Sequence, residues 1–238
     1  MSRTAGKFLP RMMRRLAPGL LLLGAAMPMA SAAAQTSGTT QAATTANIAG
    51  PTITYRKVFK SSYPEFTEVK VTQSGACTAD IRSLDDEASP QACEINPALA
   101  EKIFNLAAQL HDFNGVDLDV HRRIANLGQK TLQYESGAEK YAVTFNYTVN
   151  ESATQLVDIF EGLAREEMDL SDLQRTMRYD RLGVNDVLIR IESDYTGKLL
   201  PDPQRLLPLL DQIAGDDKYI GLARQKSRAL AEKIRATT

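Results

Sequence analysis

The two histidines of the chain, His111 and His121, lie in one short segment, HDFNGVDLDVHRR. Asp117, Asp119 and His121 occupy alternate positions, so an extended strand would place the three side chains on one face. Carboxylates and imidazoles are ligands for divalent metals, and a histidine can also serve as the base of a hydrolase. The spacing matches neither H-E-x-x-H nor the calcium loop D-x-[DN]-x-[DN]-G. We therefore expect a solvated loop without a bound metal, and keep these residues as a candidate site.

A second candidate group consists of three arginines, Arg175, Arg178 and Arg181, in the segment LQRTMRYDRLGVND. Helical spacing would place them on a ridge that could bind a carboxylate or an acidic partner surface. Asp180 and Asp186 lie in the same segment, and Asp172 directly precedes it. A helix face with internal salt bridges is therefore the alternative that we favour.

Other catalytic signatures are missing from the sequence. There is no G-x-S-x-G, no S-x-x-K and no glycine-rich phosphate loop, so we expect neither a serine nucleophile nor a bound cofactor. Neighbouring carboxylates occur at Asp85-Asp86-Glu87 and Glu166-Glu167. Because these pairs lie in polar runs, we interpret them as solvated surface rather than as acid–base pairs.

The only cysteines, Cys77 and Cys93, flank a polar segment, CTADIRSLDDEASPQAC. Cys77, Ala79 and Ile81 alternate as on one face of a strand, and Cys93 and Ile95 alternate in the same way. Both thiols would then point into the core. No nearby ligands complete a zinc site. In an oxidising compartment such a pair predicts a disulfide, with two free buried thiols as the alternative.

Residues 1–34 have the layout of a cleaved secretory signal. A basic head without acidic residues precedes an apolar run from Ala17 to about Ala30, and two A-x-A cleavage sites follow at residues 30–32 and 32–34. The run is shorter than the ~20 residues that span a bilayer. We therefore expect export to the periplasm or the medium, without a transmembrane segment after cleavage.

Residues 35–52 are small, polar and low in complexity, and predict a flexible leader. Five of the 28 Lys and Arg lie in the basic head, whereas all 29 Asp and Glu lie downstream. The mature chain, with 23 basic and 29 acidic residues, thus carries a net charge of about −6. This charge argues against binding to nucleic acid, which needs clustered positive charge.

Two strand–helix units follow between residues 53 and 168. Thr67, Val69 and Val71 alternate with charged residues, which is typical of an antiparallel sheet with one buried face. Asn96 and Asn150 are good N-caps, each followed by apolar residues at helical spacing. The pattern predicts an α+β fold, in which an antiparallel sheet of about five strands carries two helices on one face.

Residues 169–238 are helical in pattern and predict a C-terminal extension packed on the α+β domain. Its first helix is expected at about residues 169–180. Later helix starts are predicted at Asn185, at Asp202-Pro203, and at Asp216 or Asp217.

The segment ITYRKVFKSSYPEFTEVKV and the helix NPALAEKIFNLAAQLHDF resemble a group of uncharacterised exported bacterial proteins, over roughly residues 53–165. The resemblance implies export and an α+β fold, and it assigns no activity to any residue.

These observations favour an exported envelope protein without enzymatic activity. Its expected role is to bind another protein or a cell-surface polymer. The alternative is a small exported hydrolase that uses acidic residues or the loop between His111 and His121.

Overall fold

The computed structural model describes residues 50–60 and 62–237. The predicted signal at residues 1–34 and most of the predicted leader at residues 35–52 lie outside this part of the chain. Among the described residues, no helix combines the length and the apolar character needed to cross a membrane.

The described chain contains one antiparallel sheet of six strands in the order β4-β3-β2-β1-β5-β6. The strands are β1 (Thr52–Val58), β2 (Phe66–Thr72), β3 (Ala76–Arg82), β4 (Gln91–Glu94), β5 (Gln129–Ser136) and β6 (Glu139–Phe145). The α+β fold class is confirmed. The sheet has six strands rather than about five because the short extended piece at Cys93 pairs with β3.

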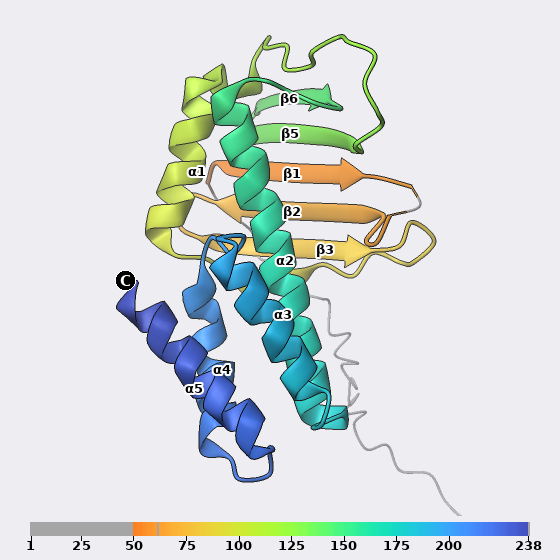
Figure 1. Cartoon of the computed structure of the whole chain (residues 1–238). Coiled ribbons are helices and arrows are strands. Elements are labelled where there is room, and N and C mark those ends of the chain that lie inside the picture. Colours follow the sequence, from red (N-terminus) through yellow and green to blue (C-terminus); the bar gives the residue numbers. More distant parts are fainter. Residues whose placement is uncertain (1–49, 61, 238) are drawn as a thin grey trace, which may run out of the picture. The chain divides into compact units, whose positions relative to one another are not determined.

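Strand alternation decides which face of the sheet is buried. Val69 and Val71 lie in the core, as the pattern predicts, and so does Tyr55 of β1. Two helices, α1 (Pro97–Gln109) and α2 (Glu151–Tyr179), cross this same face of the sheet (Figure 1). The two predicted caps are confirmed: Asn96 Oδ1 accepts the N–H of Ala98 at 2.9 Å, and Asn150 Oδ1 accepts the N–H of Ala153 at 3.1 Å.

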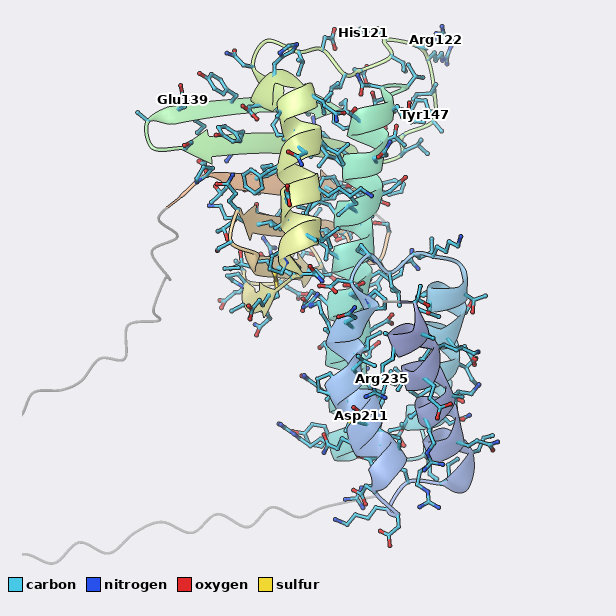
Figure 2. All side chains as sticks on the ribbon, turned by 90° about the vertical axis from the view of Figure 1, so that its left-hand side faces the viewer. His121, Arg122, Glu139, Tyr147, Asp211 and Arg235 are labelled. Atoms are coloured by element: carbon cyan, nitrogen blue, oxygen red, sulfur yellow. A yellow bond between two sulfur atoms is a disulfide. The ribbon has the colours of Figure 1, made fainter. Side chains whose placement is uncertain are left out.

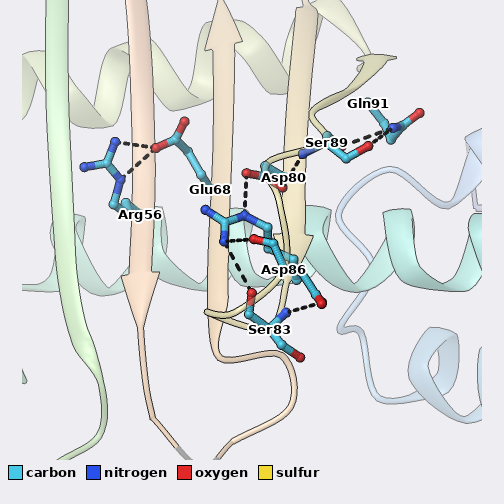
Figure 3. A network of polar contacts seen from close by, with 8 residues as sticks. Arg56, Glu68, Asp80, Ser83, Asp86, Ser89 and Gln91 are labelled. Atoms are coloured by element: carbon cyan, nitrogen blue, oxygen red, sulfur yellow. Dashed lines mark hydrogen bonds and ion pairs between the residues drawn. The ribbon is translucent and has the colours of Figure 1, made fainter.

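The opposite face of β1, β2 and β3 carries a polar network (Figure 3). Arg56 pairs with Glu68 across β1 and β2, and Arg82 pairs with Asp80 on β3. Arg82 also donates to the carbonyl oxygen of Asp86 at 2.9 Å, in the loop between β3 and β4. The network therefore holds this loop in place independently of the cysteines.

Cys77 and Cys93 form the predicted disulfide between β3 and β4. The two residues are direct partners in the antiparallel register, and their Cα atoms are 4.8 Å apart. The bond fastens the four-residue edge strand β4 to the sheet.

The expected helix at residues 169–180 is wrong as a separate element, because α2 continues without a break from Glu151 to Tyr179. Its first half packs in the sheet core, whereas Leu173 belongs to a second core formed with the C-terminal helices. Gly162 lies where residues 199–201 cross α2. A Cβ at this glycine would lie 2.6 Å from Pro201, so the close crossing requires a residue without a side chain.

The second core is formed by α3 (Val184–Thr196), a 3-10 turn η2 (Pro203–Leu206), α4 (Leu207–Gly215) and α5 (Gly221–Ala236). Two predicted caps are wrong. Asn185 lies inside α3, which begins at Val184, and α5 begins at Gly221, beyond Asp216 and Asp217. The turn η2 does begin at Pro203, directly after Asp202.

Candidate functional site

The structure brings Asp117, Asp119 and His121 together, although not on a strand. They follow a short 3-10 turn, η1 (His111–Phe113), in a segment without regular structure. His121 Nε2 lies 2.6 Å from Asp117 Oδ2, and His121 Nδ1 lies 3.7 Å from Asp119 Oδ2. The residues lie in a loop, as the favoured interpretation expects, and not on a strand face.

The three side chains have different surroundings. His121 and Asp117 have 69% and 68% of their side chains exposed. Asp119 is more enclosed and accepts the backbone N–H groups of Asn146 and His121, at 3.1 and 3.2 Å. These bonds lower the pKa of Asp119 and tie the loop to the chain that follows β6. Asp119 thus has a structural role in this loop.

The chemistry available to His121 is limited. Within residues 50–60 and 62–237, no group of three or more His, Cys, Asp and Glu side chains has an arrangement that could hold a metal ion. His121 also lies outside the lining of the pocket described below. The loop thus offers a solvated ion pair rather than an enclosed reaction site.

We expect His121 to titrate above its usual pKa. The hydrogen bond to Asp117 and the charge of that carboxylate stabilise the imidazolium, and the same bond lowers the pKa of Asp117. Histidine ring shifts measured by NMR over a pH series would give the midpoint. Asp117→Asn should return this midpoint toward that of a free histidine, and an unchanged midpoint in the variant would contradict the pairing.

The arginine ridge, the less favoured of the two interpretations, does not form as one helical row, and Arg175 forms an internal salt bridge as the favoured interpretation expects. Arg175 pairs with Asp172 at 2.8 Å, and the guanidinium of Arg178 lies 5.8 Å from the centre of the Tyr179 ring. Arg181 lies beyond Tyr179, where α2 ends, so helical spacing no longer applies to it.

Sequence patterns did not reveal a pocket of about 400 Å³ between α2 and the ends of β1, β5 and β6. Its lining includes Lys57, Phe59, Leu127, Lys130, Tyr147, Thr154, Asp158 and Glu161. A smaller hollow of about 190 Å³ shares Lys57, Phe59 and Glu161 with it. The charged residues of this lining come from two adjacent strands and one helix, segments well separated in the sequence.

Lysines and carboxylates meet in this pocket. Lys57 and Lys130 are direct partners in the register of β1 and β5. Glu161 Oε1 accepts hydrogen bonds from Lys57 Nζ at 2.8 Å and from the Tyr55 hydroxyl at 2.9 Å. Burial alone would raise the pKa of Glu161, but these bonds and the charge of Lys57 outweigh it and lower that pKa. Burial, reinforced by Glu161, raises the pKa of Tyr55.

Lys130 is buried, with 8% of the residue exposed. Its Nζ donates to the carbonyl oxygens of Asn146 and Leu127, at 3.1 and 3.3 Å. Burial and the neighbouring Lys57 lower the pKa of Lys130. A signal was present in the sequence, because Lys130 stands two positions before Leu132 on the core-facing side of β5.

Asp158 lies one helical turn before Glu161 on the same side of α2. Partial burial and the charge of Glu161 both raise its pKa. Asp158, Glu161, Lys57 and Lys130 thus place two acidic and two basic side chains around one hollow.

Exposed apolar side chains line the pocket or lie within three residues of a lining residue in the sequence. Ile124, Leu127, Tyr147 and Val149 have 39%, 43%, 44% and 78% of their surface exposed. Leu127 and Tyr147 also line the pocket. We call these four residues the Tyr147 surface. Figure 2 shows Tyr147 near His121 and Arg122, away from the Asp211–Arg235 pair of the C-terminal helices.

Asn146 holds the two segments of the Tyr147 surface together. Its side chain accepts the N–H of Leu127 at 2.8 Å and donates to the carbonyl oxygen of Ala125 at 2.9 Å. The N–H of Val120 donates to the carbonyl oxygen of Tyr147 at 3.2 Å. These bonds tie the segments that carry Leu127 and Tyr147 to each other.

Two larger hollows lie elsewhere in the described chain. In one of about 490 Å³ beside β3 and β4, Arg82 is paired with Asp80 and Arg205 with Glu167. Another, of about 870 Å³ beside α1, is lined by the exposed Lys102 and by the buried Asp202, which accepts the backbone N–H of Asn96 at 2.7 Å. In both hollows, the buried or half-buried charged side chains have partners within the protein, whereas no described residue donates a hydrogen bond to Asp158.

Comparison with known proteins does not identify a relative. No protein-family model matches the chain, and no curated protein is significantly similar to it. The chemistry of the pocket and of the Tyr147 surface is therefore the basis for a functional proposal.

Proposed function

We propose that the protein is an exported, non-enzymatic interaction module, which binds another macromolecule of the cell envelope through the Tyr147 surface. The observation that carries the proposal is the grouping of four large apolar side chains, 39% to 78% exposed, beside a pocket that contains charged groups. Contiguous exposed apolar residues with polar surroundings are typical of binding sites on soluble proteins.

Two features of the chain support this proposal. The disulfide between Cys77 and Cys93 suits an oxidising compartment outside the cytosol. The rigid support from Asn146 reduces the ordering that binding would otherwise require, and preorganised surfaces bind more tightly for the same contact area.

The hydrolase alternative receives less support. His121 is 69% exposed, and an exposed histidine–aspartate pair has no walls to orient a substrate or to exclude water. Asp119 is occupied by two backbone N–H groups. Loss of an enzymatic activity in His121→Asn, with the fold retained, would revive this alternative.

We expect Tyr147→Ser/Val149→Ser to lose binding while remaining folded, because the two side chains are 44% and 78% exposed and neither belongs to the buried core. Removal of central apolar contacts typically weakens binding by tenfold or more. The measurement is affinity capture from envelope extract, with quantitative mass spectrometry of the bound proteins and chemical analysis of bound polymers.

A matched control is Tyr179→Ser/Leu182→Ser, which removes two equally apolar side chains, 77% and 73% exposed, at the end of α2. Wild type and control should capture the same partner in similar amounts. Equal capture by the Tyr147/Val149 variant, or loss of capture in the control alone, would contradict the assignment of the surface.

A further inference from the structure

We propose that the pocket between α2 and the sheet binds a neutral sugar unit. This inference rests on the proposed function, since it names the chemistry that the interaction module recognises. Four properties of the pocket support it: its volume, its balance of charge, its unused hydrogen-bonding groups and its aromatic rim.

The volume and position suit a small ring. The pocket of about 400 Å³ falls in the range of small-molecule sites, roughly 300 to 1,000 Å³. Because Leu127 and Tyr147 belong both to the lining and to the Tyr147 surface, the pocket opens directly onto that surface. Neighbouring units of a polymer could therefore continue over Tyr147 and Val149.

The charge of the lining favours a neutral ligand. Lys57 and Lys130 face Asp158 and Glu161, so the two basic groups are balanced by two acidic groups. An anionic ligand would meet the carboxylates, and a cationic ligand would meet the lysines. A ligand rich in hydroxyl groups can donate hydrogen bonds to the carboxylates and accept them from the lysines, because each hydroxyl is both donor and acceptor.

Hydrogen-bonding capacity remains available in the pocket. Glu161 Oε1 accepts two bonds, but none of the described residues donates to Oε2. Lys130 Nζ, which has three donors, reaches two carbonyl oxygens. Asp158 accepts no hydrogen bond from any other residue that the structure describes. Bonds from hydroxyls to charged groups are stronger than those between neutral groups.

Aromatic residues complete the site. Phe59 and Tyr147 line the same pocket, on the chain that follows β1 and on the chain that follows β6. One face of a sugar ring presents C–H groups, which pack on aromatic rings, while its hydroxyls point sideways to polar groups. Aromatic rings beside carboxylates and an ammonium group thus match both parts of a sugar ring.

Titration of the isotopically labelled protein, followed by backbone amide NMR, tests the proposal. The neutral probes are glucose, N-acetylglucosamine, cellotriose and chitotriose; glucuronic acid and glucosamine are the charged counterparts. We expect at least one neutral probe to shift the amides of Leu127, Thr154 and Asp158. Tighter binding of the trisaccharide than of its monosaccharide indicates a polymer as the source, and equal binding indicates a free sugar.

Asp158→Ala should weaken this binding at least tenfold, because it removes an acceptor that holds no other described bond. Glu151→Ala, which removes an exposed carboxylate from the first turn of α2 outside the pocket, is the matched control and should bind like wild type. Absence of shifts with all neutral probes, stronger binding of a charged counterpart, or unchanged binding in Asp158→Ala would overturn the inference.

The capture experiment separates this failure from failure of the proposed function. If no sugar binds while Tyr147→Ser/Val149→Ser still loses a captured partner, the interaction module remains and its pocket is not a sugar site. If both experiments are negative, the proposed function fails as well.

Discussion

Raising the pH from about 6 to about 9 is expected to lower the free energy of unfolding by roughly 2 to 3 kcal/mol through a single buried carboxyl group. That group is Glu166 in α2, which is fully buried and whose pKa burial raises from 4.5 to about 8. In the unfolded chain the same group releases its proton near 4.5. Between these values the folded protein binds more protons, so stability falls as the pH rises.

The surroundings of Glu166 explain why the shift is large despite favourable contacts. Asp202 donates its backbone N–H to Oε1 at 2.6 Å, and Arg205 Nη1 lies 3.5 Å from Oε2. Both contacts favour the carboxylate, whereas burial and the carboxylate of Asp202 oppose it. Arg205 divides its charge with Glu167, to which it also donates. Burial therefore prevails, and the neutral acid is the form that the fold stabilises.

Urea denaturation of wild type, Glu166→Gln and Glu167→Gln at the two pH values tests this account. Glutamine cannot ionise, so Glu166→Gln should lose the part of the alkaline destabilisation that Glu166 causes. Because Arg205 divides its charge between Glu166 and Glu167, Glu167→Gln leaves the guanidinium to Glu166 and should flatten the slope, but less than Glu166→Gln does. Equal slopes in all three proteins would show that Glu166 is ionised in the folded state at neutral pH.

The neighbouring pair Glu166-Glu167 was interpreted from the sequence as solvated surface, and for Glu166 this is wrong. Both residues lie in α2, and most of their neighbours in the sequence are polar. Glu166 is covered by the segment that contains Asp202 and Arg205, which lies more than thirty residues later in the sequence. A local pattern cannot contain that packing. For Lys130 the alternation in β5 indicates the core-facing side, but the groups that cover it belong to α2 and Asn146.

Features with a local cause were predicted correctly. The caps at Asn96 and Asn150 depend on the side chain and on backbone N–H groups two or three residues away. Alternation in β2 and β3 placed Val69, Val71 and Cys77 in the core. The pocket was missed because its lining unites β1, β5 and α2, which only the folded chain brings together.

Loss of the disulfide is expected to lower the free energy of unfolding by about 3 kcal/mol, since the bond closes a loop with a sequence separation of 16 residues. The effect arises largely in the unfolded chain, which gains freedom when Cys77 and Cys93 are no longer joined. Cys77→Ala/Cys93→Ala removes the bond without adding a polar group to the core, where Cys77 is 4% exposed. The measurement is urea denaturation with and without a reductant.

Reductant should lower the stability of wild type to near that of the double variant and should leave the variant unchanged. Ala92→Ser, which alters an exposed side chain on β4 but keeps the bond, is the control and should remain near wild type. The loop between the cysteines is also held by Arg82, through Asp80 and the carbonyl oxygen of Asp86. Because these contacts survive reduction, the fold should persist, with faster hydrogen exchange confined to β4. If the free energy of unfolding falls by less than about 1 kcal/mol, the contacts of Arg82 already restrict this loop in the unfolded chain, and the disulfide adds little.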